Sequence, residues 1–574
     1  MSDHQHKHGR PLLGGASLAL ALLATVGAGP AGAVAYPPHT AGTSGAAPTA
    51  ATTDGQASTT DGQASPELAL ALTTPKLPQG VPDGTKVLEP PNVSGVAPLP
   101  GPVATPARLN PNMGILDVTP DEGITGTPVK VTGTHLPANT SIELTWSTSN
   151  VTWLVQPEPD TVNYLGRDSS DFSVIIGRAT TDAQGAFSYN FDAPADFGGV
   201  HDIYAVAQGQ ADAHGGFLIE RTVTVKPTSG PVGTPITVTY TGLGSSFYPG
   251  GASLLYDNHY VGEMMANWTR GTARAVIRAA GPPGRHVIQI GDAISFLYLN
   301  IAQSPLPYAT GATAIFTVTR DSGPPPPSVD WPNAVTPTLN AYTTLAASGL
   351  AVHSKVQARL STTSGPVGTQ VSVNASGLAS SDPVQLVWST VVGSRVDCTS
   401  ICWAYASTTL GTQAPTDANL HSSLTVPDGL GGWHVVQLVQ DGKIVAQVPF
   451  YVKESLVGPG VSSVVVKQGQ TFTVHLKGVG WTQHDNTVAV DYDNSYVGYG
   501  CGFNSNGDVQ LSLRATGGPG THLIDIYPML YTESPSFANT PYGMVPILTY
   551  ASDEPALALG YQLPAIRLAI EVVK

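Results

Sequence analysis

Two short stretches of the chain carry oxygen donors of the kind that a hard metal ion prefers. The sequence YDNHYVG begins at Tyr256, and YDNSYVG begins at Tyr492. The candidate metal ligands are Asp257, Asn258, Asp491, Asp493 and Asn494. Ca²⁺ needs six or more oxygen ligands, and each copy offers only two or three. Because Asp and Asn side chains bond their own backbone and tolerate left-handed geometry, a tight turn is the favoured interpretation, with calcium binding and direct ligand contact as alternatives.

Four histidines occur in a repeated Gly-x-His context, which makes them suspects for acid–base chemistry. They are His201, His286, His434 and His522, and apolar residues follow each one at alternate positions. A catalytic group rarely needs a copy at the same strand position of every module. We therefore predict partly buried rings that hydrogen-bond the backbone at a strand corner, like the corner tyrosine of immunoglobulin-type sandwiches.

Aromatic side chains could stack on the faces of sugar rings. Trp146 and Trp388 lie two positions after Leu144 and Leu386, between apolar neighbours, which is typical of the core tryptophan of a sandwich. Other tryptophans do not recur between copies, and Trp and Tyr give a large contact area at modest entropic loss. The possible ligand contacts are Trp268, Trp403, Trp481, Tyr260 and Tyr496.

The chain has only three cysteines. Cys398 and Cys402 lie in the sequence DCTSIC, and export would allow a disulfide between them if the backbone brings them within reach. Two thiolates without a second nearby pair leave zinc short of ligands, which disfavours a metal site. Cys501 has no evident partner, so it is either a buried thiol or a cysteine that pairs between chains.

The sequence contains no G-x-S-x-G, no H-E-x-x-H and no phosphate-binding loop. Paired carboxylates of the glycosidase kind are defined by their separation in space, which a sequence does not give. Four small sandwiches would leave no further domain for a catalytic scaffold. We expect no enzyme, and no cofactor apart from calcium in the alternative given above.

Composition and charge exclude some classes of partner. The 574 residues include 25 Lys and Arg against 40 Asp and Glu, so no basic surface for nucleic acid is expected. A basic start, an apolar run and the sequence AVA ending at Ala35 predict a secretory signal peptide. Because no second apolar span follows, no membrane span is expected after cleavage.

Internal repeats predict the domain organisation. TSGPVGT occurs at residues 228–234 and 363–369 and precedes alternating runs that are typical of half-buried strands. LTWST and LVWST mark the first and third copies, whereas the Tyr-Asp-Asn motif marks the second and fourth. We predict an all-β protein of four tandem immunoglobulin-like β-sandwich domains in the order A-B-A-B, after a disordered N-terminal stalk. The predicted parts are a signal peptide (1–35), a disordered low-complexity linker (36–110), domain A1 (111–226), domain B1 (227–320), a Pro-rich linker (321–352) that holds the two halves apart, domain A2 (353–455) and domain B2 (456–574).

Residues 111–574 resemble bacterial extracellular immunoglobulin-like modules, including the group known as IPT/TIG domains. The likeness rests on GPVGTPITVTYTGL and GPVGTQVSVNASGL at an opening hairpin, and on GPPGRHVIQI and GGPGTHLIDI at a late strand. The resemblance implies a spacer, a stalk, an adhesive surface or a binding appendage. We expect a secreted or cell-surface structural or adhesive protein whose partner is an extracellular protein. The alternative is a protein that binds carbohydrate or cell-wall glycan through exposed aromatic residues.

Overall fold

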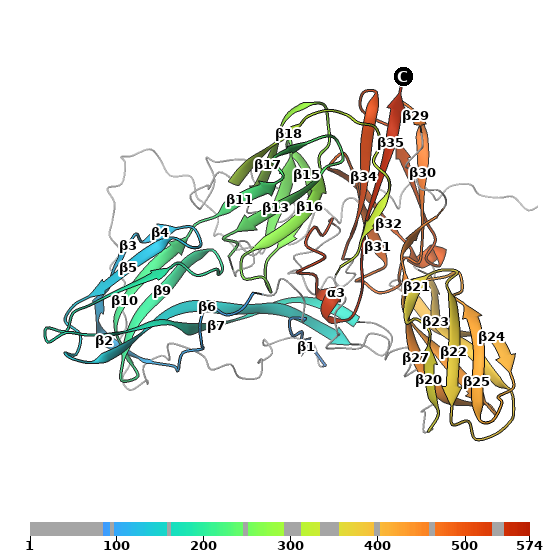
Figure 1. The fold of residues 1–574 in the computed structure, drawn as a ribbon, viewed down its shortest axis with the longest axis horizontal. Helices are drawn as coiled ribbons and strands as arrows, with labels where there is room; N and C mark the ends of the chain where they lie inside the picture. The colour runs from blue at the N-terminus through green and yellow to red at the C-terminus, as the bar shows by residue number, and fades with distance from the viewer. Residues whose placement is uncertain are drawn as a thin grey trace, which may run out of the picture. The chain divides into compact units, whose positions relative to one another are not determined.

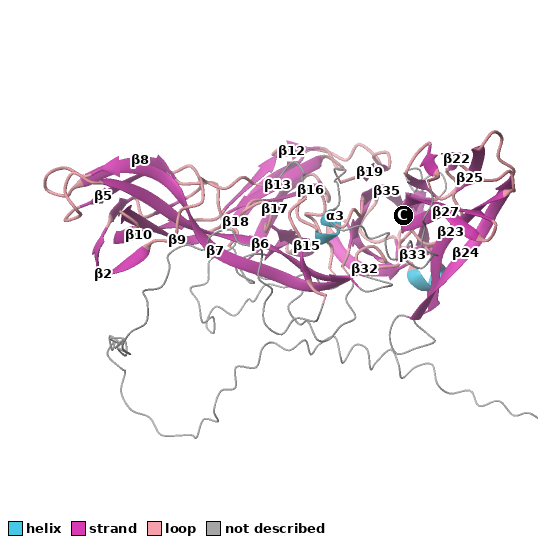
Figure 2. Ribbon diagram, turned by 90° about the horizontal axis from the view of Figure 1, so that it is seen from below, coloured by secondary structure: helices cyan, strands magenta, loops and turns pink. Residues whose placement is uncertain are grey.

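The structure is a computed structural model, and it describes residues 84–91, 97–157, 162–244, 251–291, 312–332, 355–394, 402–457, 465–530 and 545–574. The signal peptide expected in residues 1–35 lies outside this part of the chain. Nearly all the secondary structure in the described ranges is β-strand (Figure 1, Figure 2). None of the helices found there is long and apolar enough to span a bilayer.

The described strands form four β-sandwiches, which we call A1, B1, A2 and B2 in chain order. Each sandwich sets a three-stranded sheet against a larger sheet. The strands of A1 are β3 (Asp117–Thr119), β5 (Pro128–Gly133) and β8 (Phe187–Asp192) in the small sheet, and β1 (Lys86–Val87), β2 (Arg108–Ile115), β4 (Glu122–Gly123), β6 (Ser141–Pro157), β7 (Val162–Thr180), β9 (Gly199–Ala207) and β10 (Gln210–Ile219) in the large one. The strands of B1 are β11 (Thr222–Lys226), β13 (Pro235–Thr241) and β16 (Ala273–Arg278) opposite β12 (Ser229–Gly230), β14 (Gly251–Tyr256), β15 (His259–Met265), β17 (Gly284–Gly291) and β18 (Ala312–Val318).

The second pair of sandwiches repeats this plan. The strands of A2 are β20 (Gln357–Leu360), β22 (Gln370–Ser376) and β25 (Asn419–Thr425) opposite β21 (Ser364–Pro366), β23 (Val384–Ser394), β24 (Cys402–Gln413), β26 (Gly432–Gln440) and β27 (Lys443–Lys453). The strands of B2 are β28 (Ser455–Leu456), β30 (Thr471–Lys477) and β33 (Val509–Arg514) opposite β19 (Ser328–Asp330), β29 (Val465–Lys467), β31 (Thr487–Tyr492), β32 (Ser495–Cys501), β34 (Gly520–Pro528) and β35 (Ala565–Val573). Two short helices, η2 (Phe503–Ser505) and α3 (Pro555–Ala558), also lie in the B2 part of the chain. The strand order is that of immunoglobulin-like sandwiches, which confirms the predicted fold class.

The repeated TSGPVGT sequence forms a short strand that runs parallel to the last strand of its sandwich. β12 pairs with β18 in B1, and β21 pairs with β27 in A2. After the strand, Thr234 Oγ1 donates to the carbonyl of Pro231 at 2.7 Å, which closes a tight turn. A Cβ atom at Gly230 would lie 2.4 Å from Thr234 Oγ1, so glycine permits this close approach.

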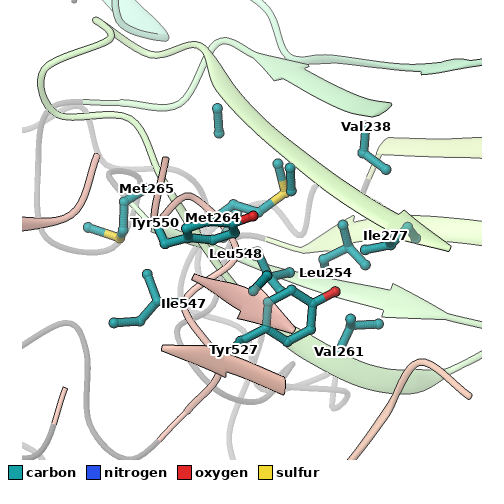
Figure 3. Packing of buried hydrophobic residues seen from close by; sticks show 14 of the residues in the cluster. Val238, Leu254, Val261, Met264, Met265, Ile277, Tyr527, Ile547, Leu548 and Tyr550 are labelled. Carbon is teal, nitrogen blue, oxygen red and sulfur yellow. The ribbon is translucent and has the colours of Figure 1, made fainter. Parts of the chain in front are cut away.

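Alternation of apolar residues places the cores between the sheets, as expected for half-buried strands. Trp146 is completely buried in the core of A1, and Trp388 is buried in the core of A2. The core of B1 forms one hydrophobic cluster with B2 residues outside the B2 sandwich core, such as Leu523, Tyr527 and Ile547, whereas the core between the B2 sheets is a separate cluster. Figure 3 shows this shared core, with Tyr527, Ile547, Leu548 and Tyr550 of B2 beside Val238, Leu254, Val261, Met264, Met265 and Ile277 of B1.

The expected Pro-rich spacer (321–352) is wrong for its first part, because residues 321–330 are bound to B2. The carboxylate of Asp321 accepts hydrogen bonds from the backbone N–H of Thr521 at 2.7 Å and from its hydroxyl at 2.6 Å. Strand β19 then pairs with β35. The shared core also contradicts the expectation that the proline run holds two halves apart. Prolines stiffen this segment, but the carboxylates of Asp321 and Asp330 bind its two ends to B2.

The expected disordered linker (36–110) is also wrong for its last part. Strand β1 pairs with β6, and the N–H of Leu88 donates to the carbonyl of Trp153 at 2.8 Å. Further on, the N–H of Ala97 donates to the carbonyl of Trp268 at 3.1 Å, and β2 begins at Arg108. Side-chain composition predicted disorder, whereas strand edges in A1 and a turn of B1 supply these residues with backbone partners.

Candidate functional site

The four repeated histidines all form the same two contacts. Each ring stacks on a Trp or Tyr of the neighbouring strand in the same sheet, with ring centroids 4.4 Å apart for His201, 5.3 Å for His286, 4.8 Å for His434 and 5.5 Å for His522. Each Nε2 donates to the backbone carbonyl four residues earlier, at 2.6, 2.8, 2.9 and 2.8 Å in the same order. These contacts confirm the predicted backbone bonding at a strand corner.

The two Tyr-Asp-Asn motifs form two-residue hairpin turns, between β14 and β15 in B1 and between β31 and β32 in B2. Both turn residues have positive φ, 49° and 66° for Asp257 and Asn258 and 51° and 58° for Asp493 and Asn494. Such angles are those of a type I′ turn, whose twist matches the flanking strands. Asp and Asn accept this conformation more readily than other non-glycine residues.

The Asp of each turn also ties the hairpin to the next strand. In B1, Asp257 accepts from the Nδ1 of His286 at 2.5 Å and from the N–H of Val287 at 2.8 Å. In B2, Asp493 bonds the Nδ1 of His522 and the next N–H in the same way. Among the described residues, no group of three or more His, Cys, Asp or Glu side chains is arranged to hold a metal ion. The geometry of the candidate donors is therefore accounted for by folding contacts.

We expect the hydrogen bond between Asp493 and His522 to be detectable as a shift in the pKa of His522. Burial acts to lower the pKa of His522, but the hydrogen bond and charge of Asp493 raise it above its usual value. The variant Asp493→Asn should lower this pKa, measured by NMR of the imidazole C–H resonances. Asp417→Asn, on an exposed turn, is the control and should leave the resonance unchanged. An unchanged pKa in Asp493→Asn would mean that the Asp493 carboxylate does not bond this ring in solution.

A buried ionic network joins B1 to B2. Arg278 of B1 lies with its Nη2 2.8 Å from Oδ1 of Asp525 in B2, and Nη1 of Arg567 lies 3.2 Å from the same oxygen. Arg567 also donates to the hydroxyl of Tyr527 at 2.7 Å and to the carboxylate of Asp330 at 2.9 Å. The side chains of Arg278, Arg567 and Asp525 are 6 %, 2 % and 1 % exposed. Their charges are therefore stabilised by one another rather than by water.

Asp491, one of the candidate calcium ligands, lies beside this network. Burial, followed by the negative charge of Asp525, raises the pKa of Asp491 well above its usual range. Burial makes this carboxyl group harder to ionise, and a carboxyl group that resists ionisation is a poor ligand for Ca²⁺. The side chain of Asn494 is buried as well, and its Nδ2 donates to the carbonyl of Arg278 at 2.7 Å. Both residues therefore belong to the B1–B2 interface.

The structure corrects the choice of aromatic ligand contacts. Trp268 is 3 % exposed and Trp481 is 2 % exposed, so neither can present a ring to a glycan. Trp268 donates from Nε1 to the hydroxyl of Thr152 in A1 at 3.1 Å. Tyr260 and Tyr496 face each other across B1 and B2, with ring centroids 6.4 Å apart. Trp268 and Trp481 do not recur because they fill contacts between different sandwiches, Trp268 with A1 and Trp481 with A2.

The remaining candidates are only partly described. The side chain of Trp403 and the predicted disulfide between Cys398 and Cys402 lie outside the described residues. Cys501 is half-buried as a free cysteine, and its Sγ lies 3.3 Å from the hydroxyl of Thr487.

Four buried carboxyl groups lie around an aromatic cluster that sequence reasoning missed. Rings of Tyr164, His484, Tyr561 and Tyr451 follow one another at centroid distances of 6.3, 5.8 and 6.4 Å. They come from A1, B2 and A2. The carboxyl groups are Glu454, Asp485, Asp553 and Glu554.

Burial raises the pKa of all four groups. The pKa is about 8 for Glu454, about 7 for Asp485, about 7 for Asp553 and about 8 for Glu554. In Glu454 the nearby charge of Asp485 adds to the effect of burial, and in Glu554 the charge of Asp553 does so. Two of the carboxyl oxygens, Oδ2 of Asp485 and Oε2 of Glu554, have no hydrogen-bond partner among the described residues. Such oxygens are stable when buried only if the group is neutral.

Comparisons with known proteins identify no family. No family model matches the chain, and no curated protein matches it. Fibronectin(III)-like modules of Clostridium thermocellum CbhA match 38% of this chain and 94% of their own at 12% identity and a TM-score of 0.13. Salmonella alpha-2-macroglobulin reacted with methylamine matches 82% of this chain and 30% of its own at 8% identity and a TM-score of 0.14. Bacteroides ovatus SGBP-B, in complex with a mixed-linkage heptasaccharide, matches 62% of this chain and 70% of its own at 11% identity and a TM-score of 0.14. Scores this low do not bear on function, and the fold assignment rests on the strand order.

Proposed function

We propose that this protein is an exported, non-catalytic structural or adhesive component whose immunoglobulin-like modules, of the IPT/TIG type, form a rigid scaffold. The observation that carries the proposal is the interface between B1 and B2. It combines a continuous hydrophobic core with the Arg278, Arg567 and Asp525 network. Modules joined only by linkers are expected to move relative to one another, whereas a large apolar interface holds them in one arrangement.

The state of the polar residues supports a non-catalytic role. The histidines and the Asp of the two turns form hydrogen bonds with backbone groups and with each other. A general acid or base has to reach a substrate, and these groups are held at strand corners instead. Export is supported by the signal-like sequence of residues 1–35.

The glycan-binding alternative is less well supported. Trp268 and Trp481 were two of its main candidates, and both are buried. Trp331, Tyr405 and Tyr499 are exposed in the described part of the chain, at 36 %, 41 % and 49 %. Tyr405 belongs to A2, while Trp331 follows β19 and Tyr499 lies on β32, at opposite edges of the large B2 sheet. A carbohydrate site commonly needs aromatic faces together with several polar groups that fix the ligand. A thermal melt against millimolar cell-wall glycans should therefore leave the Tm unchanged, and a saturable rise would favour this alternative.

Fractionation of washed cells tests the proposal. We expect the protein in the envelope or medium, with an N-terminus that begins after Ala35. A protein found wholly in the cytosol with Met1 intact would contradict export and, with it, the scaffold function outside the cell.

A further inference from the structure

The outer edge of the B1 sheet is covered by a strand-like segment from B2. Residues 546–548 lie along β15 through an isolated parallel bridge between Glu263 and Ile547, and a turn begins at Leu548. The N–H of Glu263 donates to the carbonyl of Pro546 at 2.9 Å, and the N–H of Leu548 donates to the carbonyl of Glu263 at 2.9 Å. This is the hydrogen-bond pattern of a parallel pair of strands. Ile547 and Leu548 pack beside Val261 and Met264 of B1 (Figure 3).

The same edge of B2 has no such cover in the described part of the chain. The Tyr-Asp-Asn motifs align β15 with β32, so Val261 corresponds to Val497 and Glu263 to Tyr499. Val261 is 0 % exposed and Glu263 is 0 % exposed, whereas Val497 is 53 % exposed and Tyr499 is 49 % exposed. β32 is the last strand of its sheet, and β31 is its one neighbour there. By the register of β15, the backbone N–H and carbonyl of Tyr499 point to this open edge.

A hollow of about 550 Å³ lies along this edge, between β32 and β33. Its walls include Val490, Val509 and Leu511 of the core, and Gly498 and Gly500 of β32. Gly500 stands where B1 has Met264, whose side chain is completely buried. A Cβ atom at Gly498 would meet no atom within 4 Å, whereas one at Gly500 would lie 2.7 Å from Cδ2 of Leu511, so the hollow opens over Gly498.

We propose that the β32 edge of B2 is a docking site for an extended apolar strand of a partner protein. The strand pairs in parallel with β32 around Tyr499 and inserts an apolar side chain into the hollow over Gly498 and Gly500. The occupant has the chemistry of residues 545–549, Val-Pro-Ile-Leu-Thr, since that segment covers the matching edge of B1. The inference goes beyond the scaffold function, and it stands whether or not the protein is exported.

The apolar character of the proposed partner strand follows from the covered edge of B1. A Cβ atom at Gly262 would lie 2.9 Å from Cγ of Leu548, so glycine makes room for the inserted leucine. Gly498 is the matching residue of β32. Strand addition of this kind takes affinity from backbone hydrogen bonds and specificity from the pockets for alternate side chains. Natural sheet edges are commonly protected by Lys, Pro or a covering segment, and β32 has neither Lys nor Pro.

The test uses the full chain and a fluorescent peptide, GMVPILTYA, with the sequence of residues 543–551. Fluorescence anisotropy should show saturable binding. Tyr499→Pro removes the N–H that faces the open edge, and proline is tolerated at an edge where that N–H points to solvent. We expect Tyr499→Pro to weaken binding at least about tenfold. Tyr499→Val keeps the backbone N–H, and it should bind within about threefold of the parent chain.

Two further variants distinguish the contribution of the hollow to binding from that of the backbone hydrogen bonds. Gly500→Met places in B2 the residue that B1 carries. Because a Cβ atom at Gly500 would lie 2.7 Å from Cδ2 of Leu511, the variant should push Leu511 into the hollow and weaken binding. A peptide with Leu548→Asp should fail to bind, because a charge would be buried there. Each protein variant is first checked for an unchanged thermal melt. No saturable binding, or equal binding to the parent chain, Tyr499→Pro and Gly500→Met, would overturn the docking site while leaving the scaffold proposal intact.

Discussion

Replacing Arg567 by Met should lower the free energy of unfolding by about 3–5 kcal/mol, because it removes one partner of a buried ionic network. Arg567 is 2 % exposed and bonds Asp525, Tyr527 and Asp330. Met has a similar length, so the loss comes mainly from the buried carboxylate of Asp525, which keeps Arg278 but loses Arg567, rather than from a cavity. Urea unfolding followed by tryptophan fluorescence measures the change.

Arg178→Met is the matched control for this experiment. Arg178 forms an ion pair with Glu143 at 2.8 Å, but their side chains are 62 % and 36 % exposed. Exposed pairs contribute about 0–1 kcal/mol, so this variant should change little. Equal losses in Arg567→Met and Arg178→Met would contradict the stabilising role of the B1–B2 network.

Raising the pH from about 5 to about 9 should destabilise the protein, through the four buried carboxyl groups near the aromatic cluster. Their folded pKa values, about 8 for Glu454 and Glu554 and about 7 for Asp485 and Asp553, exceed the value of roughly 4 for an unfolded chain. Between these values the folded state binds more protons than the unfolded state. Stability is therefore full below pH 4 as far as these groups are concerned, and it falls as the pH rises to about 8.

Two buried histidines act in the opposite direction at low pH. Burial lowers the pKa of His434 to about 4 and that of His484 to about 3. Their contribution is lost as the pH falls from about 6.5 toward these values. Because the four carboxyl groups outnumber the two histidines, the Tm set by these six groups should be highest at about pH 4. Thermal melts from pH 3 to pH 9 would measure this curve.

The variant Glu554→Gln tests the carboxyl groups directly. Gln cannot ionise, and its carbonyl oxygen can still accept the hydrogen bond that Oε1 of Glu554 takes from Ala556 at 3.3 Å. The fall in Tm between pH 6 and pH 9 should become shallower in this variant. Exposed Glu143→Gln should keep the parent slope, and a parent slope in Glu554→Gln would refute the assignment.

The sequence predicted the fold because its signals were local. Alternating runs, glycine-bounded turns and the Tyr-Asp-Asn motif each depend on neighbouring residues, and the turn at Asp257 and Asn258 shows the expected left-handed angles. The backbone contacts of the repeated histidines were predictable for a similar reason, since one position recurred in four modules. Trp146 and Trp388 were assigned to cores from their apolar neighbours, and both are buried.

Contacts between modules could not be predicted in this way. Trp268 and Trp481 were expected to be exposed because they do not recur, yet a contact between two different sandwiches has no reason to recur. One signal was available: Arg567 interrupts the apolar run PAIRLAIEVVK, and a charge on a buried strand requires a buried partner. Its partner Asp525 follows the His522 motif by three residues, but pairing them with Arg278 requires the three-dimensional structure.

Native-state hydrogen exchange tests the central claim that B1 and B2 form one rigid unit. Strand β16 of B1 and strand β34 of B2 contribute Arg278 and Asp525 to the network. If the interface holds them together, both strands should open with the same free energy and the same dependence on denaturant. Exchange of β16 at a clearly lower opening free energy than β34 would mean that B1 unfolds alone, and it would contradict the account.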